Sequence, residues 1–274
     1  MKLRYLGTAA AEGIPALFCS CDDCKKAWAL GGKNIRSRSQ VLVNDDLLID
    51  LPPDNFAHTV RFGLDLTTVR YLLISHRHSD HFYYTDLQYI RKGYSAPPSD
   101  WSLHVYGSPD IALEVTDFAQ LSGGQLVYKE VQPFVPFSVG QYTVTALKAY
   151  HGTDNPYIYI ITDGKSTMLY GHDTDIFPDE TWEYLKAAKI RFDLVSLDCT
   201  GAAAEDLSYH NHMCLGRNRR CREMILVAGL ADADTQFVLN HFSHNGLHSC
   251  YDDFAPIAEK EGFLTSYDGM EITF

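Results

Sequence analysis

The six-residue segment HRHSDH, at positions 76–81, constrains this chain more than any other feature of its sequence. It follows directly on an apolar run that predicts a β-strand, and imidazole and carboxylate groups are ligands for Zn²⁺, Mn²⁺ or Fe. Four such side chains in one turn cannot all face one ion, so the spacing indicates two neighbouring ions. His76 and His78 would then serve one ion, and Asp80 and His81 the other. A solvated polar loop is the weaker alternative, because adjacent cationic imidazoles repel one another unless an anion or a metal lies between them.

Four more residues of metal-binding type stand at the ends of predicted strands. Asp50 closes one apolar run, and His151, Asp173 and His241 each follow another. Taken alone, each has an ordinary explanation, since a strand-end Asp is often a turn or cap residue and a lone His is often a hydrogen-bonded structural residue. Their recurrence at strand ends, where functional groups gather on a rigid scaffold, indicates a shared site.

Short apolar runs alternate with amphipathic stretches along the whole chain. Strands are predicted at residues 3–6, 40–43, 47–50, 71–75, 103–106, 126–130, 142–149, 157–162, 167–170, 194–198, 237–240, 264–267 and 271–274. Helices are predicted at residues 83–92, 109–121, 179–188, 215–228 and 251–261. No Pro-, Gly- or Ser-rich linker divides the chain, so we expect two packed sheets flanked by helices in a single domain spanning residues 1–274.

In their order along the chain, these residues resemble the five sequence motifs of the metallo-β-lactamase superfamily. The resemblance spans nearly the whole chain, and the HRHSDH segment is highly specific to that fold. It implies an α/β (α+β) fold, the four-layered αβ/βα sandwich in which two mixed β-sheets lie between outer helices. It also implies a metal-dependent hydrolase. Because every ligand position is filled, a non-catalytic metal-binding protein is the less favoured alternative.

The resemblance assigns the candidate ligands to two divalent ions, which would be Zn²⁺ or Mn²⁺, or else Fe. The first ion would be held by His76, His78 and His151. The second ion would be held by Asp80, His81 and His241, with Asp173 bridging both ions. Asp50 would bind no metal but would orient the loop that carries the ligands.

Three cysteines crowd into one short loop, at about residues 18–25, in the pattern C-x-C-x-x-C. In a chain without an export signal, such a cluster indicates metal or redox chemistry rather than a disulfide framework. A closed zinc site needs four ligands, and a second His three residues beyond the predicted ligand in the last motif offers the fourth. The sequence therefore predicts a structural zinc bound by Cys19, Cys21, Cys24 and His244, with free thiols and a surface His as the alternative.

The Cys cluster and the pair His241-x-x-His244 resemble the PhnP-like branch of the superfamily, whose namesake is a phosphodiesterase that opens cyclic ribose phosphates. This resemblance implies hydrolysis of a small phosphodiester, cyclic diesters included, by hydroxide generated at a dinuclear metal centre. It also implies a catalytic His on the loop before the last motif, for which His212 is favoured over His210. As general acid, His212 would protonate the leaving group, while Asp80 would be a metal ligand and a partner for the proton of the attacking water.

Other hydrolases of the same fold remain open from the sequence. A thioester or lactone hydrolase of the glyoxalase II type is the main alternative, and a ribonuclease Z-like tRNA 3′-processing enzyme is less favoured. The latter fits poorly with a net charge of −12 and with the absence of a basic insertion, because an acidic surface repels long nucleic acids. The helix at 215–228 contains four arginines, which either form a solvated face or bring one cation to a substrate phosphate.

The N-terminal segment lacks the apolar core and the cleavage site of a signal peptide. No run of about 18 or more apolar residues predicts a membrane span. We therefore expect a cytoplasmic protein with a small-molecule phosphodiester as its substrate and with no membrane partner. The sequence leaves the oligomeric state open, a homodimer included.

Overall fold

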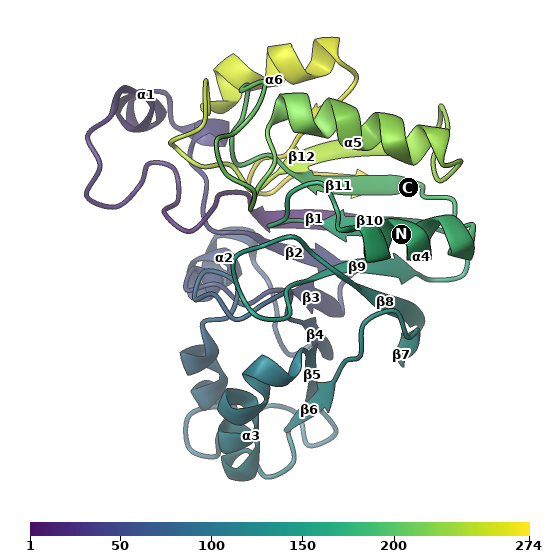
Figure 1. Cartoon of the computed structure of the whole chain (residues 1–274). Helices are drawn as coiled ribbons and strands as arrows, with labels where there is room; N and C mark the ends of the chain where they lie inside the picture. Colours follow the sequence, from purple (N-terminus) through teal and green to yellow (C-terminus); the bar gives the residue numbers. More distant parts are fainter.

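The computed structural model describes residues 1–274, and its strands form two sheets of seven strands each (Figure 1). The first sheet has the order β14-β1-β2-β3-β4-β5-β6. Its strands in chain order are β1 (Lys2–Gly7), β2 (Gln40–Val43), β3 (Leu47–Ile49), β4 (Tyr71–Leu73), β5 (Leu103–Gly107), β6 (Leu126–Glu130) and β14 (Glu271–Thr273). The pairs from β14 to β3 are antiparallel and those from β3 to β6 are parallel, so the sheet is mixed.

The second sheet has the same kind of mixed topology, with the order β13-β12-β11-β10-β9-β8-β7. Its strands are β7 (Phe137–Val139), β8 (Tyr142–Lys148), β9 (Tyr157–Thr162), β10 (Thr167–Gly171), β11 (Leu194–Asp198), β12 (Gln236–Asn240) and β13 (Leu264–Thr265). Here the pairs from β7 to β10 are antiparallel and those from β10 to β13 are parallel. Parallel strands end at one edge, which is where loops from several strands meet.

Helices lie outside both sheets, and Figure 1 shows α5 and α6 above the strands and α3 below them. The α-helices are α1 (Asp22–Leu30), α2 (Asn55–Phe62), α3 (Ala112–Leu121), α4 (Asp179–Ala188), α5 (Leu215–Val227) and α6 (Tyr251–Lys260). The 3₁₀ helices are η1 (Gly32–Asn34), η2 (Tyr84–Ile90) and η3 (Pro109–Ile111). None of the helices combines the length and the apolar character that crossing a membrane requires.

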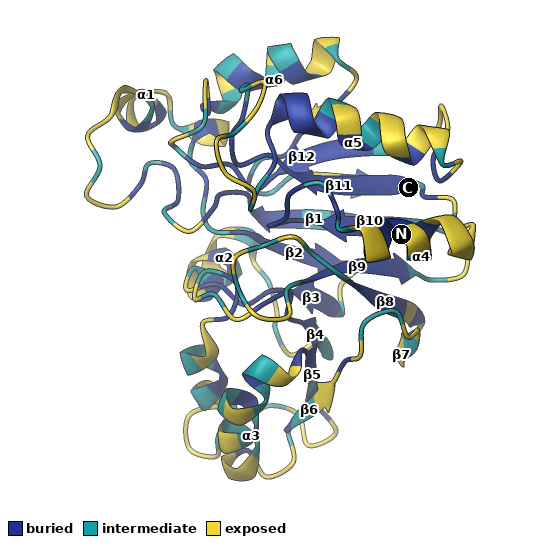
Figure 2. Ribbon diagram, viewed as in Figure 1, coloured by how far each residue is buried: buried dark blue, intermediate teal, exposed yellow.

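Alternating side chains in the strands explain the layering, because successive residues of a strand face opposite sides of its sheet. In β2, Val41 and Val43 enter the apolar cluster between the two sheets, whereas Leu42 enters the cluster between the first sheet and its helices. A third cluster fills the space between the second sheet and helices such as α4 and α5. Figure 2 shows the result as buried strands between helices whose outer faces are exposed. Three apolar interfaces separate four layers, as the resemblance implies.

Helices α1 and α2 were not predicted, and neither turns a mostly apolar face toward the core. In α2 the buried residues are the polar Asn55 and His58, whereas Phe56 and Val60 are 77% and 67% exposed. The usual pattern of apolar residues facing the core is thus reversed. In α1 only Cys24 and Ala27 are buried, and charged residues fill most of the other positions.

The predicted helix at 83–92 is instead the 3₁₀ helix η2, and the short strand β7 was missed. In η2 the residues that pack against the outer cluster of the first sheet are Leu87 and Ile90. They are three residues apart, and side chains at this spacing lie on one line in a 3₁₀ helix, so both reach the same cluster.

Candidate metal centre

The predicted ligands lie at one end of the two sheets. Asp50 follows β3 and segment 76–81 follows β4 in the first sheet. His151, Asp173 and His241 follow β8, β10 and β12 in the second sheet. Loops from both sheets therefore meet at one edge of the sandwich, and the predicted ligands form two adjoining clusters there. A third group joins Asp173 and His241 to Asp198 and His212.

The first cluster joins three imidazoles to a carboxylate. The ligand atoms of His76, His78, His151 and Asp173 lie within 4.8 Å of one another. The Nδ1 atom of His78 is 3.0 Å from Nε2 of His76 and 3.1 Å from Nε2 of His151. Oδ2 of Asp173 is 3.2 Å from Nε2 of His76. These four side chains are the set that the sequence assigned to the first ion together with its bridging carboxylate.

The second cluster shares Asp173 with the first. Its ligand atoms come from Asp80, His81, Asp173 and His241 and again lie within 4.8 Å of one another. Nε2 of His81 is 3.3 Å from Asp80 Oδ2, 3.0 Å from Asp173 Oδ2 and 3.2 Å from Nε2 of His241. Asp173 is the one residue that belongs to both sets, as expected for a bridging ligand.

The composition of the clusters fits divalent cations. Imidazole nitrogens converge on each other at hydrogen-bond distance, and Oδ1 of Asp173 is buried without a hydrogen-bond partner. Three carboxylates of this region, those of Asp50, Asp173 and Asp198, are at most 3% exposed. Buried carboxylates are paired or coordinate metals, and lone pairs that point at one another need a cation between them. One ion in each cluster would satisfy both requirements.

Burial and neighbouring charges shift the acidities within the clusters. Burial lowers the pKa of His76 to about 4 and also lowers the pKa of His151, which favours the neutral imidazole that binds metals. Burial acts in the same direction on His81, but the carboxylates of Asp80 and Asp50 outweigh it and raise the pKa of His81 well above its usual value.

Four of the imidazoles have a hydrogen-bond partner on the nitrogen that faces away from the cluster. These pairs are His76 Nδ1 with Ser75 Oγ (3.0 Å), His81 Nδ1 with Asp50 Oδ2 (2.7 Å), His151 Nδ1 with Asn211 O (3.1 Å) and His241 Nδ1 with Thr200 Oγ1 (2.9 Å). Such partners fix the ring orientation and leave Nε2 for a metal. Oδ1 of Asp50 also accepts from the backbone N–H of Ser75 at 2.8 Å, so Asp50 is placed to orient the loop.

Three of the strand-end residues adopt left-handed backbone conformations. The φ angles are +68° at Asp50, +55° at Asp173 and +63° at His241. This region is unfavourable for residues with a Cβ atom, and such strain concentrates at functional sites. The backbone therefore turns sharply at the residues whose side chains point into the clusters.

The family model of the β-lactamase superfamily domain matches residues 46–242, which is more than half of the chain. The chain belongs to the metallo-β-lactamase superfamily. The resemblance drawn from the sequence is thereby confirmed, and so is the α/β (α+β) sandwich with two mixed sheets that it implied. No curated protein sequence matches the chain.

Solved structures share this metallo-β-lactamase fold over the full chain. Zn²⁺-bound PqqB from Methylobacterium extorquens has 19% identity and a TM-score of 0.74, with 100% of both chains covered. A diphosphatase from the PhnP family has 19% identity and a TM-score of 0.74, with 100% of this chain and 97% of the other covered. Human tRNase Z, short form, has 16% identity and a TM-score of 0.67, with 100% and 99% covered. At these identities the similarity establishes the fold alone.

His212 lies beside the metallo-β-lactamase clusters, against two carboxylates. Its Nδ1 atom is 3.0 Å from Oδ2 of Asp198 and 3.0 Å from Oδ1 of Asp173, the latter without hydrogen-bond geometry. Burial lowers the pKa of His212, but the carboxylates of Asp198 and Asp173 outweigh it and raise that pKa to about 11. Nδ1 is therefore occupied by Asp198, and Nε2 is the atom left for a ligand.

Asp198 was not among the site residues expected from the sequence. It is the last residue of β11, between strands β10 and β12, which both lead to predicted ligands. Its carboxylate also accepts from the backbone N–H groups of Thr200 and Met213, both at 2.9 Å. The strand-end rule that selected Asp50 and Asp173 could have found it.

His210, the second choice for the general acid, lies outside the clusters. Its Nδ1 atom is 3.0 Å from Oδ2 of Asp175, and 72% of its side chain is exposed. The structure thus places His212, and not His210, next to Asp173.

The cysteine cluster is brought together with the predicted fourth ligand. The ligand atoms of Cys19, Cys21, Cys24 and His244 lie within 4.8 Å of one another. Nδ1 of His244 is 3.5 Å from Sγ of Cys19 and 3.5 Å from Sγ of Cys21. Three thiols and one imidazole at this spacing fit a tetrahedral zinc ion.

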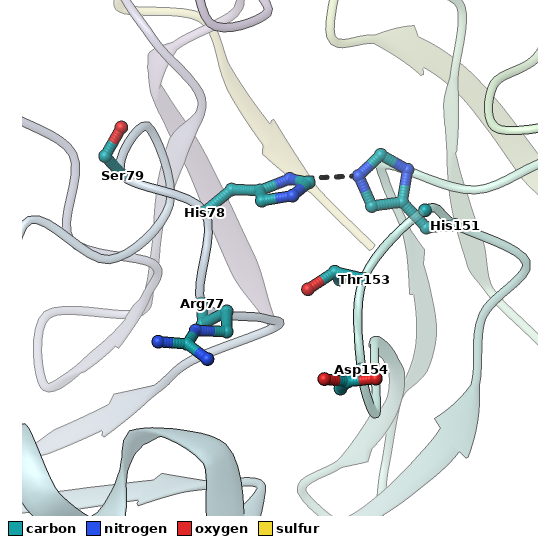
Figure 3. A pocket seen from close by; sticks show the side chains of 7 residues that line it. Arg77, His78, Ser79, His151, Thr153 and Asp154 are labelled. Carbon is teal, nitrogen blue, oxygen red and sulfur yellow. Dashed lines mark hydrogen bonds between the residues drawn. The ribbon is translucent and has the colours of Figure 1, made fainter.

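Two cavities, of about 660 and 410 Å³, share His78 and His151 in their walls. Figure 3 shows the larger one, where these two imidazoles face each other and Arg77 and Asp154 lie on opposite sides. The smaller cavity is lined by ligands of both clusters and by His212 and Tyr209. A small molecule in this cavity would therefore contact both clusters and the candidate acid.

Proposed function

We propose that this protein is a metal-dependent phosphodiesterase that hydrolyses a small phosphodiester. The observation that carries the proposal is the convergence of the ligands in two clusters that share Asp173, with His212 beside the shared carboxylate. Bound there, two divalent ions, Zn²⁺ or Mn²⁺, would polarise phosphoryl oxygens and acidify water. The chain's own residues would hold these ions, position the ester and move protons.

The proton for the leaving alkoxide would come from His212. Its Nδ1 atom is hydrogen-bonded to Asp198, which fixes the orientation of the ring in the wall of the smaller cavity. Nε2 is then free to donate to an oxygen that departs from phosphorus, as general acid catalysis requires. Asp80 would act mainly as a ligand, because its carboxylate lies 3.3 Å from His81 inside the second cluster.

A small phosphoryl substrate is supported by three observations. Two structural neighbours are by name a diphosphatase and a tRNase Z. The cavity at the clusters measures about 410 Å³, which suits a small molecule. A net charge of −12 opposes binding of long nucleic acids. We also propose that the four-residue Cys and His cluster binds a structural zinc.

The proposal is tested with protein loaded with Zn²⁺ or Mn²⁺ and assayed on bis-p-nitrophenyl phosphate, a thioester and a lactone. We expect the phosphodiester to be hydrolysed well above the buffer rate. The variant His78→Ala should lose about 100-fold or more of this activity together with bound metal. His104→Ala, which changes an imidazole on β5 outside the clusters, is the matched control and should behave as the parent protein. Hydrolysis of the thioester or lactone alone would refute the phosphodiesterase assignment.

The acid role of His212 has its own test. His212→Ala should slow diesters with poor leaving groups by about 100-fold or more. It should leave the metal content unchanged, because neither predicted ligand set contains His212. Loss of an ion from His212→Ala would instead indicate that His212 binds metal together with Asp173, Asp198 and His241, whose ligand atoms also lie within 4.8 Å of one another. Equal rates in the variant and the parent protein on such diesters would show that another group supplies the proton.

A further inference from the structure

Arg217 lies in the first turn of α5, and its side chain is 4% exposed. Its guanidinium donates to two carboxylates and three backbone carbonyls: Asp206 Oδ1 from Nε (2.7 Å), Asp175 Oδ2, Tyr209 O and His212 O from Nη1 (2.8, 2.8 and 3.1 Å), and Leu207 O from Nη2 (2.7 Å). Every guanidinium nitrogen is thereby engaged within the protein. Arg217 is therefore not available to a substrate phosphate. Of the two roles that the sequence left open for the arginines of this helix, a solvated face or a phosphate-binding cation, Arg217 has neither.

Four of the five acceptors lie in loop 205–212, which carries His212 into the site. This loop makes no backbone–backbone hydrogen bond. Four of its carbonyls accept hydrogen bonds from side chains, three from Arg217 and one, that of Asn211, from His151. The conformation of the loop therefore depends on one buried side chain more than on the loop's own backbone.

The fifth acceptor links the loop to the bridging ligand. Asp175 lies two residues beyond Asp173, and its Oδ2 atom accepts from Arg217 and contacts Nδ1 of His210 at 3.0 Å. Arg217 thus joins the segment that holds Asp173 to the loop that holds His212. The relative position of these two side chains decides whether the proton donor meets the reacting ester.

The loop also packs directly against the helix that carries Arg217. A Cβ atom on Gly216 would lie 2.0 Å from the carbonyl oxygen of Glu205, so only glycine permits this approach. The loop is therefore fixed in two ways. It packs closely against Gly216, which has no side chain, and it accepts four hydrogen bonds from Arg217.

We propose that Arg217 is a positioning residue, which fixes loop 205–212 so that His212 and Tyr209 form one wall of the substrate cavity. For its effect on catalysis the inference rests on the proposed function. Arginine suits this task because its planar group presents five donors in fixed directions. A lysine could pair with Asp175 or Asp206 but could not reach all five acceptors.

The experiment compares Arg217→Met with Arg222→Met in metal-loaded protein. Arg222, on the same helix, donates to Glu261 O and lies over Phe263, away from loop 205–212. Hydrogen–deuterium exchange should speed up in the loop for Arg217→Met and stay unchanged there for Arg222→Met. Arg217→Lys should show a smaller increase and serves as the test if the methionine variant does not fold.

Catalysis is read with methyl p-nitrophenyl phosphate and methyl phenyl phosphate, which differ only in the leaving group. Because phenolate departs less readily than p-nitrophenolate, it depends more on a well-placed acid. We expect Arg217→Met to lose about 10- to 100-fold on the phenyl ester and clearly less on the p-nitrophenyl ester. A general loss of folded protein would lower the rates on both esters by the same factor. Any effect of Arg222→Met should be of this kind.

The two hypotheses fail in different ways. Unchanged exchange in loop 205–212, or equal losses on both esters, would overturn the positioning role of Arg217. If the parent protein hydrolysed neither ester, the phosphodiesterase proposal would fail, and the exchange measurement would still decide whether Arg217 holds the loop.

Discussion

The left-handed conformation of His241 leads to a prediction about stability that reverses the usual ranking of alanine and glycine. A non-glycine residue in this region costs about 1–2 kcal/mol, because its Cβ atom crowds the following carbonyl oxygen. The φ angle of His241 is +63°, and the residue is 1% exposed. The fold bears this cost at a residue whose side chain must point at the second cluster.

The variants His241→Ala and His241→Gly both remove the imidazole and its contact with Thr200, so their difference isolates the Cβ atom. Glycine relieves about 1–2 kcal/mol of strain. It also loses about 0.4–1 kcal/mol through the greater freedom of the unfolded chain. The glycine variant should therefore be the more stable of the two, by about 0.8 kcal/mol at the midpoints of these two ranges.

His151 supplies the matched control, since it is also a strand-end ligand candidate but has no positive φ angle. There alanine should be the more stable, by about 0.4–1 kcal/mol. The assay is urea unfolding of metal-stripped protein in the presence of chelator, because residual metal would stabilise the native state. If alanine were at least as stable as glycine at both positions, the strain assigned to His241 would be refuted.

Three further predictions concern other parts of the molecule. Asp50→Ala should weaken metal binding at the second cluster by about 10- to 100-fold in competition with a chromophoric chelator, whereas Asp45→Ala, at a residue whose side chain is 78% exposed, should not. Cys24→Ser and His244→Ala should each remove one equivalent of zinc by elemental analysis and lower the melting temperature, whereas Cys221→Ser should keep that zinc. Burial lowers the pKa of His58 to about 4, so the unfolded state binds more protons below about pH 6.5. Acidification from pH 7 to pH 5 should then lower the free energy of unfolding by about 2 kcal/mol more in the parent protein than in His58→Gln.

The candidate ligands that the structure brings together could be selected from the sequence because their signals are local. Four of them occupy one turn, and the others directly follow apolar runs, so that a pattern of a few residues identifies each candidate. Asp198 also ends a predicted strand, as Asp50 does, but a single acidic residue at a strand end has many ordinary explanations. Its importance depends on β11 lying between β10 and β12, and this order becomes visible only when the sheet is assembled.

Helices α1 and α2 could not be recognised for a different physical reason. Sequence patterns detect helices that bury apolar side chains, whereas α2 buries His58 against polar partners. Nδ1 of His58 is 2.7 Å from Gln40 Oε1, and Nε2 is 2.7 Å from Ser37 Oγ. Both partners lie about 20 residues away in the chain, so no local pattern announces these contacts.

Arg217 shows the same limit at the level of function. Four arginines on one helix predict either a solvated face or a phosphate-binding cation. Arg217 is neither, because it is buried and four of its five acceptors belong to a loop without regular structure. Although the protein is acidic, it can still bind an anionic ester if divalent ions occupy the clusters. Asp50, Asp173 and Asp198 are buried at the site, and divalent ions would balance their charge locally. The cations that meet the substrate are therefore expected in the two clusters, which leaves the buried arginine to hold the loop.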